Sequence, residues 1–344
     1  MKKIRFGVTG TNFISDWMIA GARQDPRFEL SAVCSRSEER AQAFAERHGI
    51  PLRFSSLEKM AACQEVDAVY LATPNFRHAD QSMLCMEHGK HVLCEKPLAS
   101  NAREASEMAA AARRHGVVLM EAMKATLNPN FAALRDALGQ IGTVRSYFAS
   151  YCQYSSRYNR YKAGEELPNA FNPACSNGAL MDIGVYTIYP MTALFGMPEE
   201  IRATALLLPS GTDGQGAVTF RYRGMDAAVL YSKITDSRLP AEIQGEDGTL
   251  VADRIQKISR LSLIPRASRQ PGGRGAESAV RDLSVPLDKD EYYYEMAEFI
   301  DLIESGRSES AVNSLDCSLR TMQILDEIRR QTGVVFPADG VQTT

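Results

Sequence analysis

The sequence predicts an α/β protein in which a doubly wound parallel sheet is followed by a second α/β part with a large open, mostly antiparallel sheet. Over residues 1–122, short β-branched runs alternate with segments whose apolar residues recur at helical spacing, which is typical of a parallel sheet covered by helices on both faces. After residue 123, longer strand-like runs follow one another with turns between them. Because 344 residues are enough to build two cores, we expect two domains, 1–122 and 123–344.

The elements of the first part alternate along the chain. Strands are expected at IRFGVTG (4–10), FELSAVCS (28–35), AVYLAT (68–73), HVLCEK (91–96) and VVLMEA (117–122). Helices are expected at WMIAGARQD (17–25), SEERAQAFAERHG (37–49), HADQSMLCMEHGK (78–90) and ASEMAAAARRHG (105–116). Several of these helical segments end at or near glycine, a common helix stop.

The second part is expected to be richer in strands. These are TVRSYFASYCQY (143–154), EIRATALLL (200–208), GAVTFRYR (216–223), DAAVLYSKI (226–234) and AEIQGEDGTLVAD (241–253). Helices are expected at 180–196, 295–306 and 314–333. The segment PRASRQPGGRGAES (265–278) is rich in Gly, Arg and Ser and is expected to be a mobile loop.

Composition excludes several classes of partner. The net charge of -3 gives no electrostatic basis for binding nucleic acid or an anionic membrane. No apolar run is as long as a membrane span, and the N-terminus lacks the apolar stretch of a secretory signal. The cysteines and histidines are dispersed, so we expect reduced thiols, a cytoplasmic location and no metal site.

The segment IRFGVTGTNFIS (4–15) raises the first functional question, because a strand runs into a glycine turn and then a helix. The Rossmann fingerprint G-x-G-x-x-G/A lets the backbone approach a dinucleotide's pyrophosphate. Gly10 fits the first position and Ser15 the third, while the second is asparagine, which tolerates a left-handed conformation better than most residues. The following amides would lie at a helix N-terminus, which favours phosphate. We therefore expect a Rossmann domain whose cofactor loop is Gly10, Thr11, Asn12, Phe13 and Ile14.

The residues after the second strand bear on the choice of cofactor. In Rossmann domains an acidic residue here binds the ribose of NAD, whereas arginine suits the 2′-phosphate of NADP. Here the sequence is Ser35-Arg36-Ser37, which favours NADP, with NAD possible. In the alternative, Ser35 and Arg36 are solvated and Glu38 or Glu39 reaches the ribose.

The third strand of this part ends in the segment TPNFRH. Because polar residues at the carboxyl ends of parallel strands face the cofactor crevice, we expect Thr73, Pro74, Asn75 and His78 to line it. For His78, the alternative is a residue at a helix N-terminus with no special task.

The next strand ends in Glu95-Lys96-Pro97. A lysine here can direct an ammonium at the nicotinamide end of the crevice, where it would polarise a carbonyl or lower the pKa of a substrate hydroxyl. We expect Glu95 and Lys96 to contact the cofactor and Lys96 to be catalytic. The alternative for Lys96 is a surface salt bridge.

A third group of candidates lies in GALMDIGVY (178–186). In a helix, Asp182 and Tyr186 stand four apart on one face and could reach the same substrate. A neighbouring ammonium, such as that of Lys96, would favour the phenolate, so Tyr186 could transfer a proton while Asp182 orients the substrate or the lysine. In the alternative, Tyr186 is a core aromatic residue and Asp182 a helix cap.

Taken in order, these motifs resemble the Gfo/Idh/MocA family, which includes glucose–fructose oxidoreductase and inositol dehydrogenase-like enzymes. The similarity extends over nearly the whole chain and is carried by the loop Gly10–Ser15, TPN-x-x-H at Thr73–His78, EKP at Glu95–Pro97, EA at Glu121-Ala122, G-x-L-x-D-x-G-x-x at Gly178–Tyr186 and the helix EMAEFIDLIESG. The resemblance implies a Rossmann domain, a C-terminal α/β domain and NAD(P)-dependent hydride transfer. It also implies Lys96 and Asp182 as catalytic residues and a homodimer or homotetramer formed through the C-terminal sheet.

Three positions depart from the family's pattern. Asn12 replaces the second glycine, and Asn128 stands where an aromatic residue or histidine is frequent. Tyr186 stands where sugar and inositol dehydrogenases usually carry histidine. This tyrosine is similar to that of the dimeric dihydrodiol dehydrogenase and D-xylose:NADP dehydrogenase branch.

The leading hypothesis is an NADP-dependent oxidoreductase acting on a secondary hydroxyl of a sugar, cyclic polyol or dihydrodiol, or on the carbonyl in reverse. One alternative is a ligand-sensing regulator that binds the cofactor without redox chemistry. Another is a glycosidase-like lyase in which a tightly held NAD is reduced and reoxidised in each turnover.

The substrate contacts are the least specified part of the sequence. Lys124, Arg157 and Tyr158 are the candidates, because the segment 157–173 precedes the catalytic residues and is expected to overhang the pocket. Arginines and lysine of this segment could bind an anionic group on the substrate. Alternatively, Arg157, Arg160 and Lys162 are solvated charges that balance Glu165 and Glu166.

Overall fold

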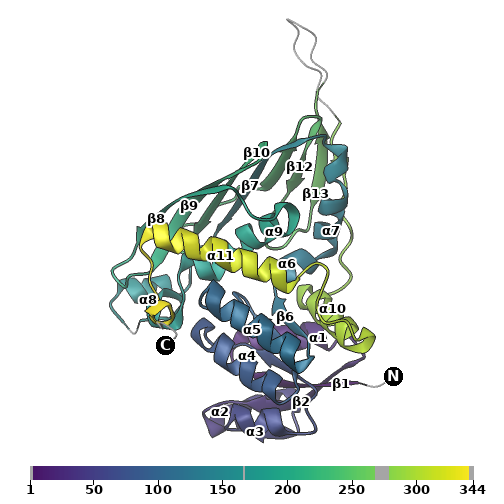
Figure 1. Cartoon of the computed structure of the whole chain (residues 1–344), viewed down its shortest axis with the longest axis vertical. Helices are drawn as coiled ribbons and strands as arrows, with labels where there is room; N and C mark the ends of the chain where they lie inside the picture. The colour runs from purple at the N-terminus through teal and green to yellow at the C-terminus, as the bar shows by residue number, and fades with distance from the viewer. Residues whose placement is uncertain (1–2, 166, 268–278, 341–344) are drawn as a thin grey trace, which may run out of the picture.

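The computed structural model of the chain describes residues 3–165, 167–267 and 279–340. Its strands form two sheets: a parallel sheet from the N-terminal part and a larger, mostly antiparallel sheet from the C-terminal part. Figure 1 shows the two sheets at opposite ends of the molecule, with helices packed around the first and between the two. The predicted fold class is confirmed.

The parallel sheet has the strand order β3-β2-β1-β4-β5-β6, with the reversal between β1 and β4 where Rossmann sheets open their ligand crevice. Its strands are β1 (Ile4–Thr9), β2 (Phe28–Cys34), β3 (Leu52–Phe54), β4 (Ala68–Leu71), β5 (His91–Glu95) and β6 (Leu119–Ala122). Its helices are α1 (Phe13–Ala22), α2 (Glu38–His48), α3 (Leu57–Ala62), α4 (His78–Glu87) and α5 (Ala102–His115), with the 3₁₀ turn η1 (Asn75–Arg77). The short β3 and α3 were not predicted.

Local signals in the sequence explain where these helices begin and end. The side chain of Ser37 accepts a hydrogen bond from the Arg40 N–H at the start of α2, and Asn101 does the same for the Glu104 N–H at the start of α5. Gly49 and Gly116 end the same two helices in the left-handed conformation.

The second sheet has the order β14-β13-β12-β11-β7-β10-β9-β8 and is antiparallel except between β7 and β10. Its strands are β7 (Val144–Cys152), β8 (Glu200–Leu207), β9 (Asp213–Tyr222), β10 (Met225–Ser232), β11 (Ala241–Gly245), β12 (Gly248–Ala252), β13 (Leu261–Pro265) and β14 (Arg281–Asp282). Every long strand was predicted, whereas β13 and β14 were not. The run 241–253, expected as one strand, is instead the antiparallel hairpin of β11 and β12. Most of the expected loop 265–278 lies outside the described residues.

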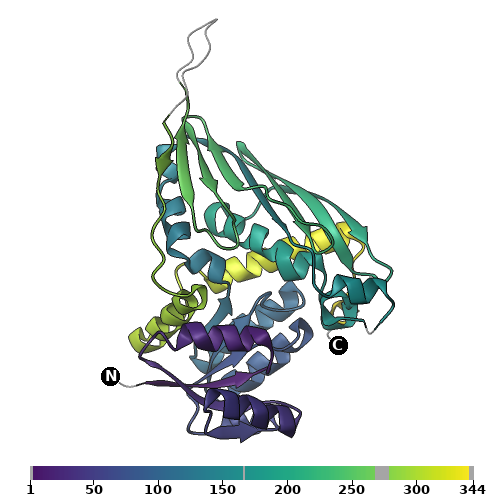
Figure 2. The same cartoon turned by 180° about the vertical axis from the view of Figure 1, so that it is seen from behind.

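The remaining helices lie against this sheet and between the two domains. They are α6 (Lys124–Leu127), α7 (Pro129–Asp136), α8 (Tyr158–Lys162), α9 (Val185–Phe195), α10 (Glu291–Ser305) and α11 (Leu315–Thr332), with a π-helical segment η5 (Leu180–Gly184) and the 3₁₀ turns η2 (Leu138–Gln140), η3 (Asn169–Phe171), η4 (Pro173–Cys175) and η6 (Pro337–Gly340). Figures 1 and 2 show α9 and α11 on one face of the sheet, while no described helix covers the other face. None of the helices in the described ranges is long and apolar enough to cross a membrane.

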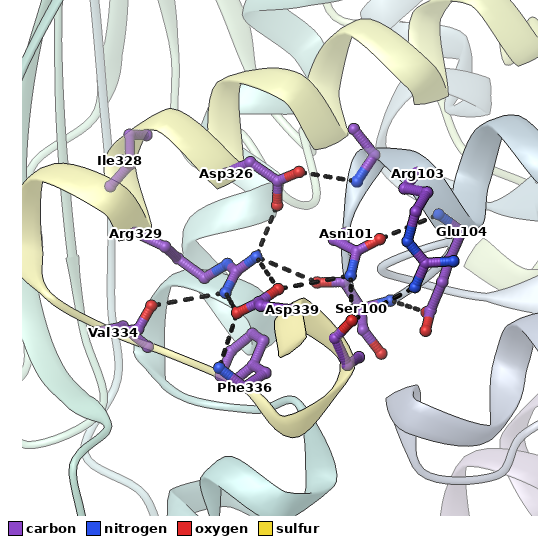
Figure 3. A network of polar contacts seen from close by, with 12 residues as sticks. Ser100, Asn101, Arg103, Glu104, Asp326, Ile328, Arg329, Val334, Phe336 and Asp339 are labelled. Atoms are coloured by element: carbon purple, nitrogen blue, oxygen red, sulfur yellow. Dashed lines mark hydrogen bonds and ion pairs between the residues drawn. The ribbon is translucent and has the colours of Figure 1, made fainter. Parts of the chain in front are cut away.

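Two helix–helix contacts are among those that join the halves of the chain. Helix α10 packs on α1, and its apolar residues Met296, Phe299 and Ile300 complete the core that holds Phe6 and Met18. Helix α11 packs on α5. Figure 3 shows the buried ion network at that second contact, where Arg329 binds both Asp326 and Asp339.

Candidate active site

The loop after β1 has the geometry of a cofactor loop at its first position. Gly10 has φ +98°, and a Cβ there would collide with the carbonyl oxygen of Ala72 after β4. Only glycine allows this close approach. The hydroxyl of Ser15, buried at the third position, donates to the Gly10 carbonyl at 2.6 Å. The structure therefore contains the tight bend that brings the N-terminus of α1 to the crevice, and this bend fits a dinucleotide.

Asn12 acts differently from the expectation. Its φ is -103°, so it does not use the left-handed conformation that asparagine tolerates. It caps α1 instead, because its Oδ1 accepts from the N–H groups of Ile14 (2.9 Å) and Ser15 (3.3 Å). Its Nδ2 donates to the Ala72 carbonyl at 2.9 Å. Two of the amides expected to bind phosphate are thus already hydrogen-bonded.

The other expected cofactor residues lie along the same edge of the sheet. Thr11 precedes the cap, and Phe13 begins α1 with 47% of its surface exposed. Ser35 and Arg36 follow β2, and the Ser35 N–H bonds the Phe54 carbonyl of β3 at 3.1 Å. Arg36 is exposed, so its guanidinium is free to meet a ligand at this edge.

The TPN segment links the two halves of the site. Thr73 and Pro74 are half-buried after β4, and Asn75 Nδ2 donates to the Ser176 carbonyl at 2.8 Å, 101 residues away in sequence. His78 is fully buried, with its ring nitrogens 2.9 Å from the carbonyl oxygens of Pro97 and Thr73. Burial lowers the pKa of His78. His78 therefore holds two loops together and does not face the crevice, contrary to the expectation of direct cofactor contact.

Lys96, Asp182 and Tyr186 come together from two parts of the fold, the end of β5 and the continuous segment η5–α9. Lys96 follows β5, and its Nζ donates to Asp182 Oδ1 (3.0 Å) and to the Asp182 carbonyl (2.7 Å). The same Nζ lies 5.0 Å from the centroid of the Tyr186 ring. One ammonium thus contacts both the carboxylate and the aromatic ring predicted to accompany it. The Lys96 side chain is only 13% exposed, so its ion pair with Asp182 is not the surface salt bridge considered as its alternative.

Lys233 is the residue of this site that the sequence analysis missed. It directly follows β10, only 4% of its side chain is exposed, and its Nζ forms an ion pair with Asp182 Oδ2. The same Nζ lies 5.2 Å from the Phe171 ring. A lysine directly after a buried strand, as in Glu95-Lys96, was the signal that could have found it.

The shared carboxylate is strongly stabilised in its ionised form. Burial disfavours that form, but the ammonium groups of Lys233 and Lys96 outweigh burial and hold the pKa of Asp182 well below its usual range. Asp182 therefore carries a negative charge flanked by two positive ones, and the group as a whole has a surplus of positive charge.

Tyr186 is a neutral phenol here. It is buried against Tyr151, with ring centroids 5.8 Å apart. Burial raises the pKa of Tyr186 well above its ordinary value, and the negative charge of Glu95 adds to this. The expectation that a neighbouring ammonium favours the phenolate is wrong for this state, because burial and the charge of Glu95 raise the pKa of Tyr186 while the Lys96 ammonium is hydrogen-bonded to Asp182.

The catalytic segment is irregular where a helix was expected. Asp182 lies in the π-helical segment η5, and Tyr186 is the second residue of the α-helix α9 that continues it. Asp213 of β9 anchors this segment, because its Oδ2 accepts from the Leu180 N–H at 2.7 Å. Burial raises the pKa of Asp213 to about 6. A Cβ on Gly178 would collide with the same carboxylate, so glycine is required for this approach.

Buried carboxyl groups lie beside the site. Tyr70 donates to Glu95 Oε1, and the Lys96 N–H donates to Glu95 Oε2 at 3.3 Å. Glu295 of α10 is 1% exposed, and neither of its oxygens has a hydrogen-bond partner within the described part of the chain. Burial, reinforced by Glu95, raises the pKa of Glu295 well above its usual value. The protonated form of Glu295 is therefore favoured, and its protonation is sensitive to charge changes nearby.

The candidate substrate residues occupy two different places. Lys124 Nζ forms an ion pair with Glu291 (3.1 Å) and lies 4.3 Å from the Tyr292 ring. Tyr158 packs on Phe171, whose ring also faces Lys233, so it stands at the border of the charge cluster.

The two arginines of the segment 157–173 have different partners. Arg160 pairs with Glu165 at 2.9 Å, as the solvated alternative predicted. Arg157 instead faces the cofactor loop, with its guanidinium carbon 5.9 Å from the Phe13 ring centroid.

Comparison with known proteins places the chain in a family. Residues 4–123 match the Gfo/Idh/MocA oxidoreductase family with an NAD-binding Rossmann fold, and residues 132–251 match the GFO/IDH/MocA C-terminal domain.

Individual relatives match over almost the full length. The chain is 49% identical over 336 residues to the scyllo-inositol 2-dehydrogenase (NADP(+)) IolU of Bacillus subtilis, covering 98% of this chain and 99% of the relative. It is 32% identical over 350 residues to the trans-1,2-dihydrobenzene-1,2-diol dehydrogenase of Danio rerio, with the same coverage. Among solved structures, the 3-ketoreductase KijD10 of Actinomadura kijaniata in complex with NADP superposes with a TM-score of 0.78, at 25% identity and over 96% of this chain and 98% of that one.

Proposed function

Because the chain belongs to the Gfo/Idh/MocA oxidoreductase family, we propose that it oxidises a secondary hydroxyl of a ring-borne vicinal diol with NADP, or reduces the corresponding ketone. It is an NAD(P)-dependent oxidoreductase acting on CH–OH groups. The names of both relatives describe six-membered rings with neighbouring hydroxyls. Cyclic polyols and dihydrodiols are therefore favoured over open-chain substrates, with cyclic sugars next.

The cofactor would be held along the edge of the parallel sheet. The Gly10 bend, the N-terminus of α1 and the TPN segment suit the diphosphate and the nicotinamide end, while Ser35 and Arg36 suit a 2′-phosphate. Bound NADP supplies the hydride acceptor at its nicotinamide C4. We infer a preference for NADP over NAD, because Ser35 and Arg36 stand where NAD-binding domains carry an acidic residue and because arginine suits a 2′-phosphate.

The observation that carries the mechanism is the position of Lys96 between Asp182 and the Tyr186 ring. In ketone reduction, the neutral phenol of Tyr186 donates its proton to the carbonyl oxygen, and the Lys96 ammonium stabilises the negative charge that develops there. In the oxidative direction the proton passes from the alcohol to the Tyr186 oxygen, which must first be ionised. We therefore expect the rate of oxidation to rise with pH and the rate of reduction to fall.

Lys233 would keep Lys96 available for substrate. A carboxylate paired with a single ammonium neutralises it, whereas Asp182 divides its two oxygens between two ammonium groups. The surplus positive charge is then present before the substrate oxygen becomes negative, which is how preorganised electrostatic catalysis works. In this proposal Asp182 and Lys233 position Lys96, and Tyr186 moves the proton.

The test is a coenzyme titration followed by a substrate panel. Fluorescence titration of the purified chain with NADPH and NADH should give tighter binding of NADPH. With NADP+, we expect absorbance change at the nicotinamide band with scyllo-inositol, other inositols or trans-dihydrobenzenediol, and less with D-xylose or D-glucose. A clear preference for NADH would contradict the role of Arg36, and tight binding without any turnover would favour a sensor.

We also infer a homodimer or homotetramer formed through the uncovered face of the C-terminal sheet. That face carries small and apolar residues in its middle strands, among them Phe148, Ala228 and Leu230, which are only half-buried in the single chain. Faces of this kind are commonly covered by a partner. Analytical ultracentrifugation should give a species larger than one chain, and a charged substitution such as Ala228→Glu should yield monomers.

A further inference from the structure

The segment that follows β7 crosses from the C-terminal domain to the cofactor loop. A tight turn begins at Ser155, whose carbonyl accepts from the Tyr158 N–H at 2.9 Å and whose hydroxyl accepts from the Arg157 N–H at 3.2 Å. This turn fixes the backbone of Arg157, and its guanidinium carbon then lies 5.9 Å from the Phe13 ring centroid. Phe13 is the first residue of α1, so an arginine of one domain faces the helix N-terminus of the other.

Arg157 differs from its neighbour in the same segment. Arg160 is held by Glu165, with 2.9 Å between Nε and Oε2. Over the described ranges, Arg157 makes no ion pair, and its guanidinium is exposed. A cation–π contact at this distance on an exposed ring is weak, so little holds the guanidinium back from an anion that arrives nearby.

The cofactor loop, for its part, has few donors to offer an anion. A helix N-terminus binds phosphate through N–H groups left unpaired in its first turn. Here Asn12 occupies the N–H groups of Ile14 and Ser15, and the first turn carries the acidic Asp16. A diphosphate at this loop would therefore meet fewer free amides than the Gly10 bend alone suggests.

We propose that Arg157 binds the diphosphate of the cofactor across the gap between the two domains. Its positive charge would compensate for the two N–H groups that Asn12 occupies. The proposal rests on the proposed function, since it requires that NADP occupy this loop. Arg157 would leave the Phe13 ring to form charge-assisted hydrogen bonds with the diphosphate. Cofactor binding would then draw the two domains together, because Arg157 belongs to one and the loop to the other.

Arg157 and Arg36 should affect the binding of NADP and NAD differently. The diphosphate is common to NADP and NAD, whereas the 2′-phosphate would lie by Ser35 and Arg36 at the end of β2. Loss of Arg157 should therefore weaken NADPH and NADH by the same factor. Loss of Arg36 should weaken NADPH alone.

The experiment compares Arg157→Ala with Arg160→Ala, its matched control from the same segment. Dissociation constants for NADPH and NADH are measured by fluorescence titration without substrate, at low and high salt. We expect Arg157→Ala to weaken both cofactors by roughly tenfold or more at low salt, as loss of hydrogen bonds to a charged group does. The difference from wild type should shrink at high salt, and Arg160→Ala should bind as wild type does.

Two results would overturn the proposal. If Arg157→Ala bound both cofactors normally and raised only the KM of the polyol, Arg157 would be a substrate residue. If it weakened NADPH but not NADH, it would contact the 2′-phosphate. Failure of the wild-type chain to bind either cofactor would instead refute the proposed function, so the two failures are distinguishable.

Discussion

Two groups of charges join the halves of this chain, and they differ in how their carboxyl groups are paired. At the contact of α11 with α5, Arg329 binds Asp326 and Asp339 at 2.7 Å each. Asp326 also accepts from the Ala102 N–H, and Asp339 from the Phe336 N–H (Figure 3). Every carboxylate in this group has both an ionic and a backbone partner.

The charges of the candidate active site are arranged otherwise. Asp182 serves two lysines at once, and Glu295 has no hydrogen-bond partner among the residues that the structure describes. Carboxylates that are held by both a charge and a backbone group fix one geometry, whereas a buried carboxyl group without a partner in the described part of the chain, such as Glu295, is one whose protonation can change. The first group therefore stabilises the fold, and the second is suited to chemistry.

The largest effect is expected from Lys96→Met. Removing the ammonium should lower kcat by at least about 10³-fold, because both charge stabilisation and the environment of Tyr186 are lost. NADPH binding and the free energy of unfolding should stay close to those of wild type. Steady-state kinetics, a coenzyme titration and denaturant unfolding measure the three quantities. Substantial residual turnover would remove Lys96 from the mechanism.

Arg329→Met should lower stability and leave activity unchanged, the reverse of Lys96→Met. Both aspartates would lose the buried Arg329 as their ionic partner, but their own side chains are 31% and 27% exposed, so the free energy of unfolding should fall by about 2 kcal/mol, less than for a fully buried pair. The kcat of the folded enzyme should be unchanged. Arg330→Met, on the exposed side of the same helix, is the matched control and should cost less than about 1 kcal/mol. Equal losses in both variants would contradict a structural role for the network.

Asp213→Asn probes the anchor of the catalytic segment. The folded pKa of about 6 lies above the ordinary value of 3.8, so the protonated form is favoured by folding. This stabilisation is complete below pH 3.8 and is lost as pH rises through 6, at a cost of up to about 3 kcal/mol. Relative to wild type, the asparagine variant should therefore be more stable at pH 8 than at pH 4.5 in urea unfolding. A difference between the two proteins that did not change with pH would contradict the raised pKa.

The smallest effect is expected from Lys233→Met, which leaves Asp182 with a single ammonium. Without Lys233 the pKa of Asp182 rises, so the acid limb of the pH profile of kcat should move to higher pH. We expect roughly a tenfold to hundredfold lower kcat at neutral pH, less than for Lys96→Met. Lys257→Met is the control, since Lys257 is an exposed lysine near Glu291. A profile identical to that of wild type would show that Lys233 is only structural.

The sequence predicted the fold class and the long elements, because their periodicity is local. It could not predict β3 or β14, which are too short for a periodic signal and exist only through pairing with a neighbour. It also could not predict that α10 packs on the first core, since an apolar stripe does not identify what covers it.

The same limit applies within the site. Motifs located Lys96, Asp182 and Tyr186, whereas Lys233 lies 51 residues beyond Asp182 with no motif around it. The role of Asn12 depended on the backbone angle, and the neutral state of Tyr186 depended on burial. Both properties arise from the folded environment and not from residue type.

The most direct test of the central claim is to follow deuterium from fully carbon-deuterated scyllo-inositol into the cofactor. After turnover with NADP+, we predict that the released NADPH carries one deuterium at nicotinamide C4, detected by mass spectrometry. NADPH released without deuterium would contradict direct transfer from the substrate carbon. Binding of the cofactor with no reduced product released for this or any other deuterated polyol would contradict the dehydrogenase itself, and would leave a sensor or a lyase that reoxidises its cofactor in each turnover.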